Sequence, residues 1–113
     1  MTGIRYDREA LRLEMEGHAG AGEKGADLTC AALSMLMMTL ERRMQERAEM
    51  TMPAVQRGPG RFMIACAPEE GEERLCRESF DTVAAGFALL AENRSENVSF
   101  SLTGGDADEE DEQ

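Results

Sequence analysis

Hydrophobic and polar side chains alternate in three parts of the chain in the manner of β-strands. Between residues 11 and 16, leucine and methionine alternate with arginine and glutamate, which predicts a strand with one buried face. Residues 4–6 predict a short partner strand just before it. Residues 97–102 alternate in the same way and predict the last strand.

Two other segments have the longer period of helices. Residues 28–48 are rich in leucine, methionine and alanine and predict a long helix, with Asp27 at its N-cap position. Because this helix is apolar almost all round for its first three turns, we expect the sheet to cover one side and a second subunit the other. A second predicted helix starts at Glu69 with acidic residues in its first turn. It carries one apolar stripe, made of Cys76, Phe80, Val83, Phe87 and Leu90.

Between the helices, residues 51–56 and 61–66 predict two short strands that flank the turn Arg57-Gly58-Pro59-Gly60. The resulting order of strands and helices predicts an α/β (α+β) fold, a two-layer sandwich of a small, mostly antiparallel sheet with two helices. The length of 113 residues corresponds to one domain. We expect that domain to span residues 1–104, and residues 105–113 to form a disordered acidic tail.

The charge balance narrows the choice of partners. The chain has 12 basic and 23 acidic residues, a formal net charge of −11, and the tail alone holds six of the acids. Direct binding to a nucleic acid needs a basic face that displaces counterions, so we expect no nucleic acid partner. A basic partner such as a ribosomal protein is favoured instead. The alternative is that the acidity only keeps the protein soluble.

Signals for a membrane or for secretion are missing from the sequence. No apolar run approaches the roughly 20 residues that a membrane helix needs. The first residues also lack the apolar stretch of a signal peptide. We therefore expect a cytoplasmic protein with reduced thiols and no membrane partner.

The three cysteines, Cys30, Cys66 and Cys76, do not predict a disulfide framework or a zinc site. Their number is odd, and their spacing fits no Cys-x-x-Cys pattern. A mixed site with the single histidine would need all three cysteines to converge, so we expect no metal and no cofactor. Cys66 and Cys76 fall on predicted apolar faces and are expected in the core.

The segment from residue 17 to residue 34 carries the candidate chemistry. It places the only histidine, His18, at a strand end and Cys30 near the start of the following helix, with a glycine-rich loop between them. Unpaired N–H groups and the positive end of the helix dipole would favour the thiolate of Cys30. A cysteine, a histidine and free N–H donors are the parts of a thiol protease.

The cysteine, the histidine and the glycine-rich loop also have simpler, non-catalytic interpretations. A cysteine in an apolar helix is commonly a small buried hydrophobe, and a lone histidine is commonly structural. The glycine loop lacks the Gly-Lys-Ser/Thr of a phosphate-binding loop and the acidic residue of a dinucleotide site. Six methionines cluster around the first helix, where they either fill the core or form an adaptable surface for a partner: Met35, Met37, Met38, Met44, Met50 and Met52.

The same segment resembles the signature of the ribosomal-processing cysteine protease (Prp) family. It begins Gly17-His18-Ala19, continues through a Gly-x-x-Gly-x-Asp pattern that ends at Asp27, and closes with Cys30-Ala31-x-x-Ser34. The number of residues between His18 and Cys30 also matches the family. The predicted order of strands and helices is similar to that of the family up to about residue 103.

The resemblance implies both an activity and a set of site residues. Prp proteins are cysteine endopeptidases that remove the N-terminal extension of a bacterial large-subunit ribosomal protein, number twenty-seven, and they form homodimers. By this resemblance Cys30 is the nucleophile and His18 its acid/base partner. The remaining motif positions are supporting residues and glycines of the substrate loop: Gly17, Asp27 and Ser34, and Gly20, Gly22 and Gly25.

Three departures from the family pattern stand beside these matches. The stretch before His18 is short, so the first strand is expected to be clipped; Thr29 replaces a β-branched aliphatic residue; and the acidic tail is extra. Two hypotheses other than a protease stay open at this point. One is a non-catalytic, acidic dimeric module that binds a basic ribosomal protein or assembly factor. The other is a redox sensor in which Cys66 or Cys76 would have to reach Cys30.

Overall fold

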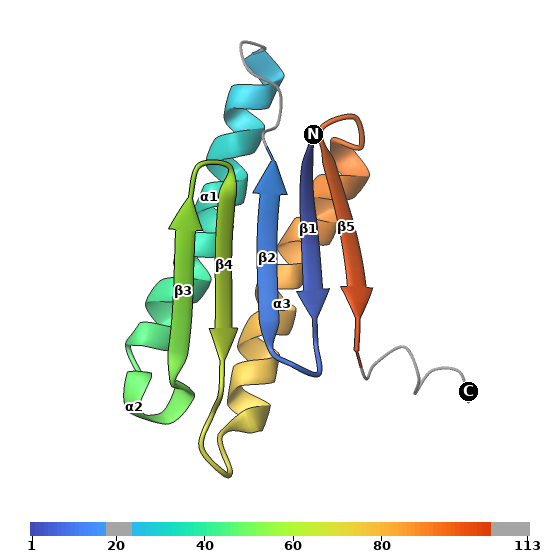
Figure 1. Ribbon diagram of the computed structural model, residues 1–113. Helices are drawn as coiled ribbons and strands as arrows, with labels where there is room; N and C mark the ends of the chain where they lie inside the picture. The colour runs from blue at the N-terminus through green and yellow to red at the C-terminus, as the bar shows by residue number, and fades with distance from the viewer. Residues whose placement is uncertain (18–23, 105–113) are drawn as a thin grey trace, which may run out of the picture.

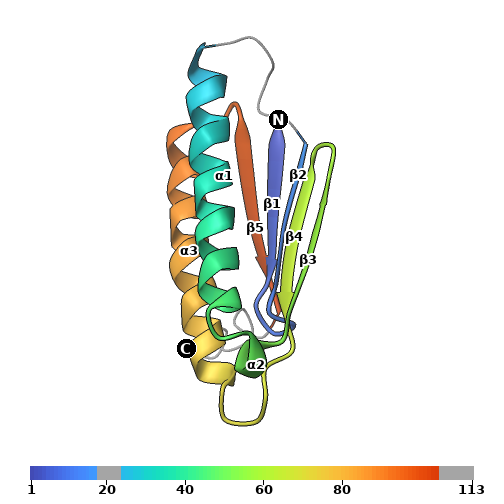
Figure 2. The same cartoon turned by 90° about the vertical axis from the view of Figure 1, so that its left-hand side faces the viewer.

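A computed structural model of the chain describes residues 1–17 and 24–104, with the backbone alone for residues 24–27. Its strands form one layer and its long helices form a second layer against one face of the sheet (Figures 1 and 2). The elements in chain order are β1 (Thr2–Asp7), β2 (Arg12–Gly17), α1 (Lys24–Gln45), α2 (Ala48–Thr51), β3 (Pro53–Gly58), β4 (Arg61–Cys66), α3 (Glu73–Asn93) and β5 (Val98–Thr103).

The predicted architecture is confirmed. The five strands form one sheet in the order β3-β4-β2-β1-β5. Three of the four strand pairs are antiparallel, and β1 with β5 is parallel. The sheet is therefore mixed but mostly antiparallel, and the two long helices lie side by side on one of its faces (Figure 2).

The expectation of a clipped first strand is wrong. Strand β1 runs for six residues and pairs along its whole length with β2 on one side and β5 on the other. Its buried side chains, Thr2, Ile4 and Tyr6, point toward the helices. Only Ile4 and Tyr6 carry a hydrophobic signal in the sequence, and the parallel pairing with β5 involves residues almost 100 positions away, so the local pattern understates this strand.

The start of α1 differs from the prediction. The helix begins at Lys24, which places Gly25 and Asp27 inside its first turn, so Asp27 is not the N-cap. One glycine costs about 1 kcal/mol in a helix interior. Each residue added to an existing helix also adds one backbone hydrogen bond, which offsets that cost. The helix ends at Gln45, three residues before the predicted end.

Strand β4 has the predicted bounds, and the remaining boundaries differ from the prediction by one to four residues. The short helix α2 ends at Thr51, and its C-cap residue Met52 has a left-handed φ of 50°, so β3 starts at Pro53 and not at residue 51. Gly71 adopts a φ of 94° in the turn before α3, and the helix therefore begins at Glu73 and not at Glu69. The turn between β3 and β4 is confined to Pro59 and Gly60.

The core lies between the sheet and the two long helices. It contains Cys76, Phe80, Val83 and Phe87 of the predicted stripe of α3, and Leu90 packs against it half-buried. Gly86 allows α3 to approach α1 closely, because a Cβ at this position would lie 2.9 Å from the Leu36 side chain. The close contact of the two helices thus uses a glycine in the middle of a helix, where the propensity scale disfavours it.

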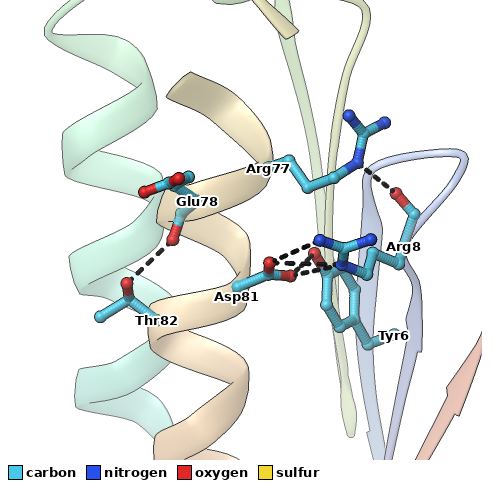
Figure 3. A network of polar contacts seen from close by, with 6 residues as sticks. All are labelled: Tyr6, Arg8, Arg77, Glu78, Asp81 and Thr82. Atoms are coloured by element: carbon cyan, nitrogen blue, oxygen red, sulfur yellow. Dashed lines mark hydrogen bonds and ion pairs between the residues drawn. The ribbon is translucent and has the colours of Figure 1, made fainter. Parts of the chain in front are cut away.

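A polar cluster ties β1 to α3 at the end of the sheet near the β1–β2 turn (Figure 3). The Tyr6 hydroxyl donates to Asp81 Oδ1 at 2.7 Å, and Arg8 donates to both oxygens of the same carboxylate at 3.0–3.2 Å. Arg77 also donates to the backbone carbonyl of Arg8 at 3.4 Å. Burial and the hydrogen bond to Asp81 raise the pKa of Tyr6, so its hydroxyl stays a donor at neutral pH.

The other face of the sheet carries a buried carboxylate. The Glu14 side chain is only 8% exposed because Arg5 and Arg61 cover it. Arg5 donates to Oε1 at 2.8 Å and Arg61 donates to Oε2 at 2.8 Å through Nε. Burial alone would raise the pKa of Glu14, but these hydrogen bonds outweigh it and hold the pKa below its ordinary value.

We predict that Glu14→Gln destabilises the fold at pH 7 by about 1–3 kcal/mol, since hydrogen bonds to a charged group are lost. The pKa of Glu14 is lower in the folded chain than in the unfolded one. Its stabilisation is therefore present above the unfolded pKa of about 4.3 and is lost as the pH falls through the folded value. Urea unfolding of wild type and variant between pH 7 and pH 3 measures this difference.

Glu16→Gln is the matched control, because Glu16 lies on the same strand and face but is 59% exposed, 3.6 Å from Arg5. We expect it to cost at most about 1 kcal/mol, as for other exposed ion pairs. Equal costs for the two variants, or a Glu14→Gln cost that persists at pH 3, would contradict the assignment.

Candidate active site

A hollow of about 240 Å³ lies where the first part of α1 faces the ends of β1, β2 and β4. Three of the residues singled out in the sequence meet there: Gly17, Cys30 and Ser34. Strand β2 supplies Gly17 as its last residue, directly before His18, and α1 supplies the other two. The hollow is smaller than the 300–1,000 Å³ typical of pockets for drug-sized ligands, and suits a single side chain.

The face that α1 presents to this hollow combines reactive and apolar groups. Cys30 and Ser34 are one helical turn apart and therefore lie on the same face. Cys30 is exposed, Ser34 is half-buried, and Leu33 between them is buried. This arrangement leaves a thiol open to a substrate above an apolar floor.

Gly17 is required by backbone geometry. Its φ is 103°, a conformation that side chains rarely adopt, and a Cβ there would lie 2.5 Å from the carbonyl oxygen of Met1. Its N–H donates to the carbonyl of Gly60 at 2.8 Å, which holds the end of β2 against the β3–β4 turn. The point at which the chain leaves the sheet toward His18 is thus fixed from both sides.

The opposite wall of the hollow contains residues that the sequence did not single out. Met15, Phe62 and Thr2 come from three adjacent strands, Gly58 is the last residue of β3, and Gly60 lies in the β3–β4 turn. Arg57 stacks on the outer part of this wall, with its guanidinium carbon 4.4 Å from the centre of the Phe62 ring. Except for Met15, none of these residues is near residues 17–34 in sequence, and the pairing of the strands brings them to the hollow.

Four of the predicted site residues fall outside the described part of the chain, in whole or in their side chains. His18, Gly20 and Gly22 lie outside the described residues, and of Asp27 only the backbone is described, in the first turn of α1. Gly25 was predicted in the loop, but its backbone is helical. The distance between His18 and Cys30 therefore stays a prediction.

The position of Cys30 in the helix also corrects the sequence analysis. Because α1 begins at Lys24, Cys30 lies in its second turn and not in the first. The N–H groups without a partner inside a helix are the first four, here those of residues 24–27. The influence of the helix dipole falls off beyond the first turn. Helix N–H donors beside the Cys30 sulfur are therefore not a feature of this structure.

The other two cysteines are in the core, as predicted. Cys66 at the end of β4 and Cys76 in the first turns of α3 are buried, and their thiols hydrogen-bond each other. Burial raises the pKa of Cys66 to about 12 and also raises that of Cys76. Both lie at the end of the molecule opposite to the start of α1 (Figure 1), so neither can act as a resolving cysteine for Cys30 in this structure.

The described residues contain neither a cluster of metal ligands nor a helix able to cross a membrane. No three histidine, cysteine, aspartate or glutamate side chains among them converge on a point where they could hold a metal ion. Among the same residues, no helix is both long enough and apolar enough to cross a membrane.

A two-layer fold with an exposed cysteine beside an apolar hollow defines a candidate thiol hydrolase, and comparison with known proteins identifies the class. The profile of the family described as cysteine protease Prp matches residues 1–99. The chain therefore belongs to the Prp family and is a cysteine protease. Among curated proteins, no match to the chain was found.

Solved structures share the fold over almost the whole chain. A crystal structure of a Streptococcus mutans protein has 25% sequence identity and a TM-score of 0.68, and the match covers 92% of this chain and 93% of that one. The ribosomal processing protease Prp of Staphylococcus aureus has been solved with a covalently linked product peptide. It shows 20% identity and a TM-score of 0.72, with 93% of this chain and 100% of that chain covered. The same S. aureus protease with a substrate peptide shows 17% identity and a TM-score of 0.74, with coverages of 91% and 100%.

We predict that Gly17→Ala destabilises the fold more than the strain of its φ alone would. A non-glycine residue at positive φ costs about 1–3 kcal/mol, and the contact with the Met1 carbonyl adds to it. Gly71→Ala is the matched control, because Gly71 has a φ of 94° but nothing within 4 Å of its Cβ position. Urea unfolding of both variants separates the two costs, and equal losses would show that the contact with Met1 is unimportant.

Proposed function

We propose that this protein is a ribosomal processing protease that removes the N-terminal extension of a large-subunit ribosomal protein, number twenty-seven, by means of a dyad of Cys30 and His18. The observation that carries the proposal is the exposed thiol of Cys30 in the same hollow as Gly17, the residue before His18. The Prp signature at residues 17–34 supports the assignment of both roles, as does the description of the S. aureus relative as a ribosomal processing protease.

The proposed reaction is acyl transfer through a covalent intermediate. His18 accepts the proton of the Cys30 thiol, and the sulfur attacks the carbonyl carbon of the peptide bond. His18 then gives the proton to the leaving amine, which departs as the new N-terminus of the product. Water, activated by the same histidine, releases the second fragment from the sulfur and restores the thiol.

The hollow favours an apolar side chain next to the bond that is cut. Its inner surface is made by Leu33, Met15 and Phe62, so an aliphatic or aromatic side chain buried there gains about 1.5–3 kcal/mol. Such a preference agrees with a substrate whose extension ends in an aromatic-rich stretch, as the family resemblance implies. A net charge of −11 favours association with a basic ribosomal protein.

The remaining motif residues have supporting roles in the proposal. Ser34 lies one turn after Cys30 and lines the same hollow, where its hydroxyl would contact a bound peptide. Asp27, in the first turn of α1, is suited to order the preceding segment. The glycines Gly20 and Gly22 would let a peptide backbone approach the site.

We predict that Cys30→Ala and His18→Ala each reduce cleavage by about 10³-fold or more, because each removes one member of a unit that acts together. The measurement is cleavage of the ribosomal protein precursor, followed by mass spectrometry of its new N-terminus. Circular dichroism and thermal unfolding confirm that each variant is folded. Arg74→Ala is the control, because Arg74 is 90% exposed on α3. This variant should cleave the precursor at the wild-type rate.

The outcome also separates the proposal from a non-catalytic module. A wild-type chain that binds the precursor without cutting it, and whose binding survives Cys30→Ala, would support an acidic binding protein instead. Cleavage by either alanine variant at the wild-type rate would rule out the dyad.

We further propose that the protein is a cytoplasmic homodimer formed through the outer face of α1. Leu28, Met35 and Met38 are 70%, 60% and 46% exposed, and their spacing of seven and three residues places them on one stripe of the helix. Of the methionines near this helix, Met37 and Met44 are buried in the core. The exposed ones are therefore available to a second copy, which would cover the side of α1 that the sheet does not.

We predict that Met35→Glu combined with Met38→Glu converts the dimer to a monomer, because two carboxylates would lose hydration at the interface. Analytical ultracentrifugation at several concentrations measures the change. Leu89→Glu is the control, since Leu89 is 58% exposed but lies on α3. A wild-type chain that is monomeric throughout, or a variant that stays dimeric, would contradict this interface.

A further inference from the structure

The face of the sheet away from the helices carries a row of three arginines. Arg5 of β1, Arg12 of β2 and Arg61 of β4 lie on adjacent strands, and their side chains are 64%, 46% and 42% exposed. Both long helices pack against the opposite face (Figure 2), so within the described residues no element covers this arginine row.

The arginine row has more donors than its one buried acceptor can use. A guanidinium carries five N–H donors. Glu14 accepts hydrogen bonds from Arg5 and Arg61, whereas Arg12 approaches it only to 3.8 Å, beyond hydrogen-bond distance. Two further carboxylates border the row. Glu16 lies 3.6 Å from Arg5, and Asp7 accepts a hydrogen bond from the N–H of Ala10 in its own turn.

A hollow lies between the arginine row and the last strand, β5. A space of about 310 Å³ is lined by Arg5 and Arg12, by the carboxylates Asp7 and Glu14, and by Thr103 at the end of β5. Thr103 pairs with Asp7 and is followed by Gly104 and then by residues 105–113. The C-terminal segment therefore starts at the wall of this hollow.

We propose that the acidic segment 106–112 of the same chain docks on the arginine row, where its carboxylates accept hydrogen bonds from Arg12 and Arg5. The segment holds six acidic residues and no basic one. The rest of the chain is itself acidic, with 12 basic residues against 17 acids once these six are set aside, and it repels such a segment elsewhere. At the arginine row the carboxylates meet exposed guanidinium groups, and charge-assisted hydrogen bonds of this kind are the strong ones.

The segment is long enough for this docking. Nine residues span at most about 30 Å when extended. Neighbouring strands are about 4.8 Å apart, so the step from Thr103 on β5 across β1 to Arg12 on β2 is about 10 Å. Arg61 on β4 is level with Glu16, so it lies about 14 Å across the sheet and about 13 Å along it, or about 20 Å away in all. The chain can therefore cross the whole arginine row without leaving the sheet surface.

The test uses the full chain with a nitroxide spin label at its end. Gln113→Cys is labelled in a Cys30→Ser background, because Cys30 is the exposed cysteine and Cys66 and Cys76 are buried. We expect the label to broaden the backbone amide signals of Arg5, Arg12 and their neighbours most strongly at low salt, and those of α3, on the other side of the sheet, much less. At about 1 M salt, where the screening length is only about 3 Å, the broadening should disappear.

Two kinds of variant make the result decisive. Arg12→Gln should weaken the broadening, whereas Arg74→Gln, on the exposed side of α3, should leave it unchanged. Replacing the six acids of the segment by their amides should abolish it, and these changes lie outside the sheet and its core. Broadening that is uniform over the surface, or that survives the amide replacement, would overturn the proposal.

A mixed sample distinguishes the segment's own chain from a second copy. Spin-labelled chains are mixed with isotope-labelled chains that lack the spin label. The proposal requires sharp signals in this mixture. Broadening of Arg5 and Arg12 there would mean that the segment reaches another copy, and would overturn docking within the chain.

Discussion

The position of β1 between β2 and β5 is the constraint on which the rest of the structure depends. Its antiparallel pairing with β2 sets the register in which Gly17 lies opposite Thr2, and its parallel pairing with β5 brings the end of the chain into the sheet. The hydrogen bonds of Tyr6 and Arg8 to Asp81 then tie this strand to α3. Because β1 pairs along its whole length on both sides, a shift of this strand by one residue would turn its core side chains, Ile4 and Tyr6, to the wrong face.

The candidate active site is a consequence of that register. Strand β2 ends at Gly17, where a positive φ and the close approach of Met1 leave room for no side chain. The chain leaves the sheet there and returns as α1, which presents Cys30 and Ser34 to the ends of the same strands. The glycine that begins the family signature therefore has a structural reason in this chain, independent of any role in chemistry.

Charge is distributed unevenly over the two faces of the sheet. The helix side buries apolar groups, whereas the open side keeps a carboxylate, Glu14, almost out of water among arginines from three strands. Removing one member of such a cluster leaves its partners without their hydrogen bonds, so the cluster holds the register of β1, β2 and β4. A very acidic chain thus retains exposed guanidinium groups on the open surface of its sheet.

The sequence by itself determined the fold class, the elements and the candidate nucleophile, because alternation, helical period and the signature at residues 17–34 are local. It placed Cys66, Cys76 and the stripe of α3 in the core correctly, since apolar periodicity reports burial directly. It misjudged β1 and the start of α1. The pairing of β1 with β5 is not visible in a local pattern, and the helix extends through Gly25 once it has formed. Only the tertiary structure decided which residues face Cys30. Phe62, Met15 and Gly60 reach it through the strand order β3-β4-β2-β1-β5, which depends on contacts between distant residues and has no counterpart in local sequence.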